Sequence, residues 1–423
     1  MNEELLHYIW QHKLYKPEIA TTKGESIEVI HPGTKNTDGG PDFFNAKIKI
    51  NDTLWAGNVE IHRNEKEWYE HQHHQDSTYD NVILHVVEQK DTSTFNSKNR
   101  DIPVCQITIG TELKAKYQHL YFNERWIPCA DAISDIDNFT LQQWIERLLI
   151  EKLQEKSLLI ESLLQESNNN WDQVFFTLLS RSFGFGINGL PFELMAKNTP
   201  LKLLLKHSDN PFQLEAILYG QSGLLFKSYQ QDEYSSALKK EYQFLKTKYQ
   251  LKPIQHHLWK FLRLRPVNFP TIRISQLAAL IHKTKGRFQI VTQLSQTKDL
   301  LKILEVETSD YWQNHFRFGV ESKSTSKKVL GKQSRSRIIF NTIIPYLYIY
   351  AAKHHNQEQK EKIIDYLYQQ PSEKNSIIDS WAAIGIHAEN EAQAQALLHL
   401  KKHYCDHKKC LNCQIGHKVL CKT

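Results

Sequence analysis

The sequence lacks the long apolar segments and the nucleotide-binding motifs that define several large classes of protein. No hydrophobic run approaches the ~20 residues that a membrane-spanning helix needs. The chain opens with Met1-Asn2-Glu3-Glu4, where a signal peptide would carry basic residues. It contains neither a Walker A motif nor a G-x-S-x-G elbow. We therefore expect a cytoplasmic protein with no membrane partner and no ATP-driven chemistry.

Cysteine is scarce, and its distribution is uneven. Four of the six cysteines, Cys405, Cys410, Cys413 and Cys421, fall within the last 19 residues. Such clustering in a chain without an export signal indicates metal ligation rather than disulfide bonding. The central C-x2-C pair lets two thiolates bind one centre, and the outer two cysteines can complete a tetrahedral site. We expect a zinc site, with a [4Fe-4S] cluster as the alternative.

Charge is also unevenly distributed. Residues 1–111 hold 11 Lys or Arg and 17 Asp or Glu, a net charge of −6, whereas residues 321–337 and 399–423 each carry +5. This layout is typical of a cation-binding site with separate surfaces for a polyanion, although solvated surface charge is the alternative for each segment. We expect nucleic acid as the partner, contacted through its backbone by Lys327, Lys328, Lys332, Arg335, Arg337, Lys401, Lys402, Lys408, Lys409 and Lys418.

Secondary-structure signals change character near residue 111. Before it, an opening helical period is followed by short β-rich runs at 27–30, 46–50, 55–62, 82–87 and 104–109, with a helical segment at 66–75 between the third and fourth. From about Thr140 onward, apolar residues recur at helical spacing. We expect an α/β domain over residues 1–111, a mostly α-helical domain over 112–400, and a four-cysteine metal knuckle over 401–423.

Two carboxylates stand out in the first hundred residues. Gly40-Pro41-Asp42 opens one expected strand, and Glu60-Ile61-His62 lies on the next. Strand alternation places Glu60 and His62 on one face, opposite Ile61. If the two strands are neighbours, Asp42 and Glu60 meet at their shared end and supply the oxygen ligands that Mg²⁺ or Mn²⁺ prefers.

These residues resemble the motif of the PD-(D/E)XK nuclease superfamily, whose core runs helix, three strands, helix, strand. The resemblance implies a mixed sheet with flanking helices, in which Asp42 and Glu60 bind the metal and His62 occupies the position of the catalytic lysine. Glu4 resembles the acid that some members contribute from the first helix. Because a neutral imidazole is not a permanent cation, the departure at His62 bears on the reaction more than on the fold.

The whole chain also resembles an uncharacterised bacterial family. The segments that carry this likeness are Gly39–Phe43, Gly57–His62, Leu84–Val87, Arg265–Pro270 and Cys410–Gly416. That likeness implies no assigned activity.

A second group of polar residues follows the Asp42–Glu60 pair. It contains His71, His73, His74 and Asp76, with His85 on the next strand. Together with Glu60 and His62, the side chains of His74, Asp76 and His85 offer enough nitrogen and oxygen donors for a transition-metal site. The alternative is that His71, His73 and His74 are exposed polar residues and that His85 is a hydrogen-bonded core histidine.

We expect a metal-dependent nuclease, or a nuclease-like protein that processes nucleic acid. A divalent cation on Asp42 and Glu60 would activate a water molecule, and His62 or His85 would accept its proton. Two alternatives remain open. One is a non-catalytic nucleic-acid-binding scaffold with a degenerate nuclease core, and the other is a His-rich transition-metal hydrolase of small substrates.

Overall fold

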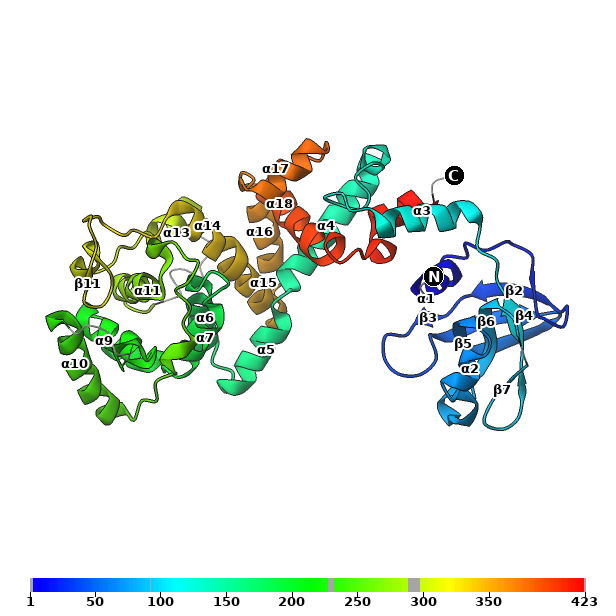
Figure 1. Cartoon of the computed structure of the whole chain (residues 1–423), viewed down its shortest axis with the longest axis horizontal. Coiled ribbons are helices and arrows are strands. Elements are labelled where there is room, and N and C mark those ends of the chain that lie inside the picture. The colour runs from blue at the N-terminus through cyan, green and yellow to red at the C-terminus, as the bar shows by residue number, and fades with distance from the viewer. Residues whose placement is uncertain (1–2, 92, 227–231, 288–296, 422–423) are drawn as a thin grey trace. The chain divides into compact units, whose positions relative to one another are not determined.

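The computed structural model describes residues 3–91, 93–226, 232–287 and 297–421, and the chain divides into two compact units (Figure 1). The sheet unit comprises Met1–Trp144, Ser380–Ile386 and Leu398–Thr423, and the helical unit comprises Ile145–Asp379 and His387–Leu397. Residues 112–144 and the cysteine-containing segment therefore belong with the sheet, whereas the sequence analysis drew its boundaries at 111 and 400.

The sheet unit contains a seven-stranded mixed sheet, as the sequence analysis predicted. Its strand order is β1-β2-β4-β5-β6-β9, with β3 paired to β4. Strands β2, β4 and β5 pair antiparallel, while β5, β6 and β9 pair parallel. The strands are β1 (Ile19–Ala20), β2 (Ser26–His31), β3 (Thr34–Lys35), β4 (Phe43–Ile50), β5 (Thr53–Asn64), β6 (Val82–Gln89) and β9 (Val104–Gln106).

Short helices flank this sheet and connect its parallel strands. The helix α1 (Glu3–Gln11) buries Leu5, Leu6, Tyr8, Ile9 and Trp10 and contacts β5. Parallel strands need a crossover connection, and the one between β5 and β6 holds α2 (Glu67–Glu70) and the 3-10 turns η1 (His73–Gln75) and η2 (Ser77–Tyr79). A small hairpin of β7 (Thr94–Phe95) and β8 (Asp101–Ile102) follows β6.

Two β-bulges bend the strands at the place where the predicted site residues lie. The β4–β5 register shifts between Phe43 and Ala46, where Asn45 adopts a left-handed backbone with φ 58°. The β5–β6 register shifts between Asn58 and Val59. Bulges change the direction in which nearby side chains project. They therefore decide which residues of β4 and β5 face one another.

The remainder of the sheet unit is helical. It holds α3 (Thr111–Phe122), the 3-10 turn η3 (Ile133–Asp135), the π-helical turn η9 (Lys401–Cys405), the 3-10 turn η10 (Cys410–Asn412) and α19 (Gln414–Cys421). Helix α19 packs against α3. This packing brings the C-terminal cysteine segment beside the residues that follow the sheet.

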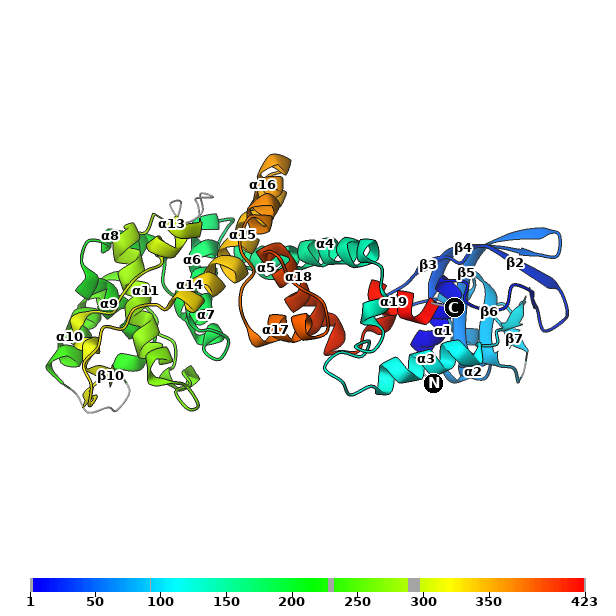
Figure 2. The same cartoon turned by 90° about the horizontal axis from the view of Figure 1, so that it is seen from above.

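The helical unit matches the helical periodicity seen after residue 140. Helices α9, α10 and α11 lie side by side in it (Figure 2), and its one described hairpin pairs β10 (His315–Arg317) with β11 (Val320–Glu321). Its other helices are α5 (Ser157–Glu166), α6 (Trp171–Phe183), α7 (Gly189–Lys197), α8 (Leu201–Lys206), α13 (Thr297–Ile303), α14 (Lys332–Ile338), α15 (Ile344–Lys353) and α16 (Gln357–Tyr368). Helix α9 spans Pro211–Gln221, α10 spans Glu233–Tyr249 and α11 spans Pro270–Thr284.

Three helices cross the boundary between the units along the chain. They are α4 (Asn138–Gln154), α17 (Ser376–Ala383) and α18 (Glu391–Leu400). Among the helices that the structure describes, none is both long and apolar enough to cross a membrane.

Candidate metal centre

The structure brings together the two carboxylates that the sequence analysis paired. Asp42 immediately precedes β4, and Glu60 lies in the neighbouring strand β5. The backbone N–H of Asp42 donates to Oε2 of Glu60 at 3.0 Å, and the backbone N–H of Ile61 donates to Oδ2 of Asp42 at 2.9 Å. Each carboxylate is thus oriented by the other strand's backbone, and both lie at the same end of the β4–β5 pair.

Helix α1 adds a third acid and an imidazole to this end of the sheet. His7 Nε2 lies 3.2 Å from Asp42 Oδ2 and 3.9 Å from Glu3 Oε1. One ligand atom from each of these three residues fits within 4.8 Å of the other two. Glu4, which the resemblance pointed to, is exposed on α1. Glu3 is therefore the acid that this helix presents to the carboxylates.

Histidines from β5 and from the crossover surround the other oxygen of Glu60. Oε1 of Glu60 lies 3.4 Å from His73 Nε2 and 3.6 Å from His62 Nε2. His62, His71 and His73 also offer ring nitrogens within 4.8 Å of one another. We call Glu3, His7, Asp42, Glu60, His62, His71 and His73 the carboxylate–imidazole cluster.

His74 and Asp76, which the sequence analysis predicted as metal ligands, belong to none of the groups of three ligand atoms that lie within 4.8 Å of one another in the described residues. The His74 ring packs beside Tyr69, with 5.0 Å between ring centroids, and its Nε2 contacts Gln75 at 3.0 Å. Asp76 caps η2 by accepting the Thr78 backbone N–H at 2.8 Å. The left-handed backbone of Gln72, with φ 62°, turns the chain before η1. This turn presents His71 and His73 to Glu60 instead.

His85 reaches the carboxylates only through His62. His62 Nδ1 and His85 Nε2 lie 2.9 Å apart, and His85 Nδ1 lies 3.0 Å from Thr94 Oγ1. The Thr94 hydroxyl donates in turn to Glu65 Oε1 at 3.3 Å. His85 is fully buried. His85 is therefore placed to orient His62, and its role as a proton acceptor stays a prediction.

This hydrogen-bonded chain fixes the tautomers of both imidazoles. A carboxylate can only accept hydrogen bonds, so the Thr94 hydroxyl donates its hydrogen to Glu65. The Thr94 oxygen then accepts a hydrogen bond from His85 Nδ1–H. His85 Nε2 is then an acceptor, which requires His62 to donate from Nδ1. The lone pair of His62 Nε2 consequently faces Glu60 Oε1. Two electron-rich atoms meet there, and either a proton on Glu60 or a bound cation relieves their repulsion.

Burial shapes the electrostatics of the cluster. Burial, together with the nearby carboxylate of Asp42, raises the pKa of Glu60 to about 9. Burial and the neighbouring imidazoles lower the pKa of His62 to about 2, and the same two causes lower that of His73 to about 4. These imidazoles are neutral at physiological pH, which is the form that ligates metals.

The donor set favours a transition metal over magnesium. Glu3, Asp42 and Glu60 supply carboxylate oxygens, whereas His7, His62 and His73 supply neutral nitrogens. Magnesium prefers oxygen ligands, while manganese, iron and zinc accept mixed nitrogen and oxygen sets. The residues present therefore fit a divalent transition metal.

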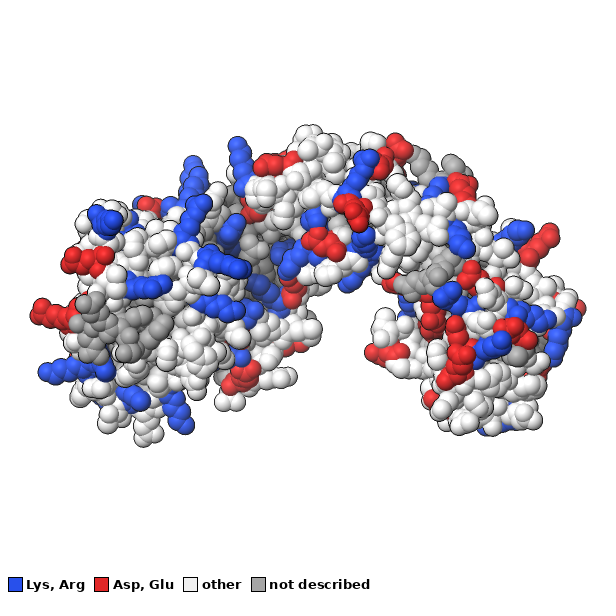
Figure 3. Space-filling model, viewed as in Figure 1, with Lys and Arg blue, Asp and Glu red and all other residues white. Residues whose placement is uncertain are grey.

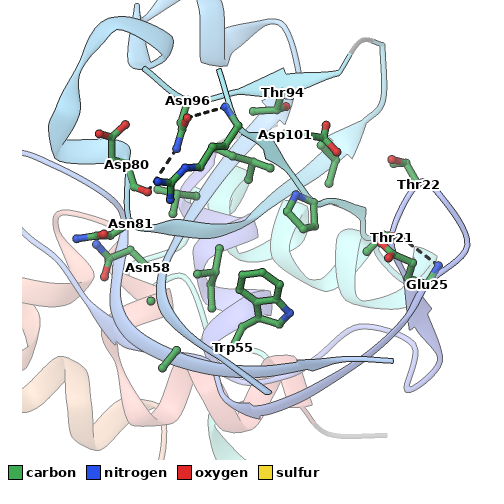
Figure 4. A pocket seen from close by; sticks show the side chains of 18 of the residues that line it. Thr21, Thr22, Glu25, Trp55, Asn58, Asp80, Asn81, Thr94, Asn96 and Asp101 are labelled. Atoms are coloured by element: carbon green, nitrogen blue, oxygen red, sulfur yellow. Dashed lines mark hydrogen bonds between the residues drawn. The ribbon is translucent and has the colours of Figure 1, made fainter. Parts of the chain in front are cut away.

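A cavity of about 1060 Å³ lies beside strands β5 and β6 (Figure 4). Asn58, Asp80 and Asn81 lie together at one end, and Thr21 and Glu25 lie at the other. The cavity wall includes Thr94, the hydroxyl that orients His85, but no side chain of the carboxylate–imidazole cluster. The cavity and the cluster thus share strands and are linked only through the hydrogen-bonded chain.

Several predicted nucleic-acid contacts in residues 321–337 have structural partners. Lys328 is buried and donates to the carbonyl oxygens of Trp312 and Gln313, which corrects its prediction as a phosphate contact. Arg335 pairs with Glu305 at 2.6 Å, and Lys327 pairs with Glu307 at 3.2 Å. Lys332 and Arg337 are exposed.

Several of the predicted nucleic-acid contacts near the C-terminus also have structural partners. Lys401 pairs with Asp406, Lys408 donates to the carbonyl oxygen of Tyr121 at 2.6 Å, and Lys418 lies 3.6 Å from Asp137. Lys402 and Lys409 are exposed. Figure 3 shows acidic side chains gathered on the sheet unit and mainly basic ones over the visible face of the helical unit.

The structure separates one of the four predicted cysteine ligands from the others. Cys421 lies at the end of α19, with its Sγ 3.8 Å from the Tyr8 hydroxyl and 3.8 Å from the His417 ring. Cys405, Cys410 and Cys413 remain together, as the electrostatic influence of Cys410 and Cys413 on Cys405 indicates. No disulfide links the cysteines within the described residues.

The fold and the cluster define an α/β protein with a mixed-sheet unit, a helical unit and a group of carboxylates and imidazoles at one end of the β4–β5 pair. The chain belongs to the DUF2851 family, described as proteins of unknown function, whose family model matches residues 3–376. The matched range includes the whole cluster and ends before the C-terminal cysteines. No curated protein matches the chain, and no solved structure does.

Proposed function

We propose that the chain is a metal-dependent hydrolase that cleaves phosphodiester bonds in nucleic acid. The observation that carries the proposal is the meeting of the partly buried Asp42 with the buried Glu60, which also faces the lone pair of His62. A divalent cation bound there satisfies electron-rich atoms that find no hydrogen-bond donor in one another.

The order of elements supports the same proposal. Helix α1, strands β2, β4 and β5, the crossover with α2, and strand β6 follow the helix, three strands, helix, strand order of the PD-(D/E)XK resemblance. With β2, β4 and β5 counted as the three strands, Asp42 opens the second and Glu60 lies in the third. These are the positions that the resemblance assigns to the metal-binding acids.

The proposed chemistry divides roles among the cluster residues. Asp42, Glu60 and His62 would hold the cation, with His7 and His73 beside them. When bound, the cation supplies Lewis acidity, which polarises the phosphodiester and lowers the pKa of a water molecule. His71 is the exposed imidazole of the cluster, so it is placed to accept a proton and pass it to solvent.

Nuclease assays with matched variants test this function. Single- and double-stranded DNA and RNA are incubated with Mg²⁺, Mn²⁺ or Zn²⁺ and with native protein, Asp42→Asn or Glu60→Gln. We expect both variants to lose roughly a hundredfold or more in rate, because each removes charge that the transition state needs. Asp52→Asn changes a fully exposed acid of the same unit and should leave the rate unchanged. Full activity in both site variants would contradict the proposal.

The imidazoles favour a second candidate, a transition-metal hydrolase of small substrates. His62, His71 and His73 form a nitrogen-rich group that a magnesium nuclease does not need. Hydrolysis of small phosphate esters or amides with Zn²⁺ or Mn²⁺, without cleavage of any nucleic acid, would favour this candidate. Nucleic-acid binding without cleavage in any metal would instead favour a non-catalytic scaffold.

A further inference from the structure

The C-terminal cysteine segment folds into a compact loop with its sulfurs on neighbouring turns. Lys408, in the left-handed region with φ 51°, donates its backbone N–H to the carbonyl oxygen of Cys405 at 3.1 Å. The N–H of Cys413 donates to the carbonyl oxygen of Cys410 at 3.2 Å. Gly416 packs against that same carbonyl, and a Cβ there would lie only 2.1 Å from the oxygen. The loop therefore depends on a glycine at 416.

A fourth cysteine approaches this loop from a distant part of the chain. Cys129 follows α3, is buried, and accepts the Ala132 N–H on its backbone carbonyl at 3.0 Å. Contacts on both sides of the loop hold this stretch in place. Lys408 donates to the carbonyl oxygen of Tyr121, and the Lys401 ammonium lies 5.2 Å from the centre of the Trp126 ring.

The four thiols form one mutually interacting group. Cys410 and Cys413 both act electrostatically on Cys129. Cys405 is influenced by the other three thiols, and Cys410 by Cys413, so an electrostatic influence links each of the six pairs. Cys421 contacts Tyr8 and His417 instead, and Cys105 lies buried in β9.

We propose that Cys129, Cys405, Cys410 and Cys413 bind one metal centre through four thiolates. Four cysteines converging from two segments far apart in the sequence provide the ligand set of a zinc site or an iron–sulfur cluster. Lys401 and Lys408, which lie at the loop, offset the negative charge that four thiolates bring. The centre would tie the C-terminal segment to the residues that follow α3.

The chemistry of the thiols agrees with a metal-bound state. Cys129 is buried, and a buried thiolate requires a cation beside it. No three of these sulfurs lie within 4.8 Å of one another in the part of the chain that the structure describes. A single zinc ion would draw them to about 3.8 Å, whereas a larger iron–sulfur cluster would keep them wider apart.

Metal analysis of paired cysteine variants tests the site. Full-length protein is purified without oxygen or chelators, and zinc, iron and acid-labile sulfide are measured per chain. Each cysteine variant is made in a Glu60→Gln background, so that metal at the carboxylate–imidazole cluster is not counted. We expect one equivalent of zinc, or iron with matching sulfide and visible absorption, in this background and after Cys421→Ser is added to it. Cys129→Ser should lose at least nine-tenths of that metal. Metal retained in Cys129→Ser but lost in Cys421→Ser would overturn the proposed ligand set.

Alkylation of the native protein keeps the test decisive if Cys129→Ser misfolds. Mass spectrometry follows iodoacetamide labelling of each cysteine before and after a strong chelator is added. Cys129, Cys405, Cys410 and Cys413 should become reactive together on chelation, while the reactivity of Cys421 should not change. A native protein with neither zinc nor iron, in which Cys405 and Cys410 are labelled without chelator, would overturn the proposal.

Discussion

Two buried glutamates, one in each unit, show how differently the same side chain is used. Glu215 in α9 accepts hydroxyl hydrogen bonds on both oxygens, from Ser275 at 2.5 Å, from Ser309 at 3.1 and 3.0 Å, and from Tyr234. Glu60 in β5 accepts one backbone N–H and otherwise faces two imidazoles at 3.4 and 3.6 Å. The two residues are only 3% and 5% exposed.

The difference lies in the donors rather than in burial. Hydroxyl donors can compensate a buried carboxylate, so Glu215 is satisfied by its own unit and connects α9, α10, α11 and the Ser309 loop. The neutral imidazole of His62, whose lone pair faces Glu60, cannot do this. We therefore infer that Glu60 serves to bind a ligand, whereas Glu215 stabilises the helical unit.

The largest expected effect is on folding, and it separates the two glutamates. Glu215→Ala leaves three hydroxyls without their acceptor and should destabilise the helical unit by about 3–5 kcal/mol. Glu60→Ala removes a carboxylate that the metal-free protein does not compensate, so the sheet unit should change by less than about 1 kcal/mol. Urea denaturation of the metal-free protein, followed by fluorescence, measures both. Equal destabilisation by the two changes would remove the distinction.

For metal affinity, we expect a large effect at Glu60 and none at Glu215, the reverse of their expected effects on the free energy of unfolding. Glu60→Gln should weaken Mn²⁺ or Zn²⁺ binding at the cluster by about a hundredfold or more, because a neutral amide replaces a charged ligand. Glu215→Gln should leave that affinity unchanged. Isothermal titration is performed in the Cys129→Ser background, so that only the cluster is titrated. An unchanged affinity in Glu60→Gln would show that the ion binds elsewhere.

A smaller effect is expected at the outer end of the hydrogen-bonded chain. Thr94→Val removes the hydroxyl between Glu65 and His85, so the His62 tautomer that faces Glu60 is no longer fixed. Outer partners of this kind change metal affinity by about 10–100-fold. Thr53→Val, at the exposed start of β5, is the matched control and should bind normally. Normal affinity in Thr94→Val would contradict the tautomer assignment.

The sequence predicted the parts of the site that depend on neighbouring strands. Alternation along β5 and the position of Asp42 before β4 were enough to bring the two acids together, and β6 emerged as a strand from its apolar run. Helix α1 presents Glu3 rather than Glu4 to the carboxylates because of its rotation against β5. The spacing of acids in the sequence does not define this rotation. That rotation is set by which apolar residues of α1 are buried.

Contacts between segments far apart in the sequence determine which other residues come together. In the proposed four-thiolate centre Cys129 takes the place of Cys421. The packing of α19 on α3 brings the surroundings of Cys129 near the C-terminal loop, and the spacing of these segments in the sequence carries no such information. The buried hydroxyl network of Glu215 also joins residues from separate helices. A signal for it does exist, since a glutamate within the buried, mainly apolar part of α9 requires partners.

The smallest expected effect distinguishes adjacent histidines in the crossover. His73 lies 3.4 Å from Glu60, whereas His74 packs beside Tyr69. His73→Ala should therefore weaken metal binding by about tenfold, as expected for loss of one neutral donor near the ion. His74→Ala should change it less than about twofold, because that imidazole meets neither group of ligand atoms. Since the two residues share a short turn, titrations that gave both variants the same loss would mean that η1 rotates when metal binds.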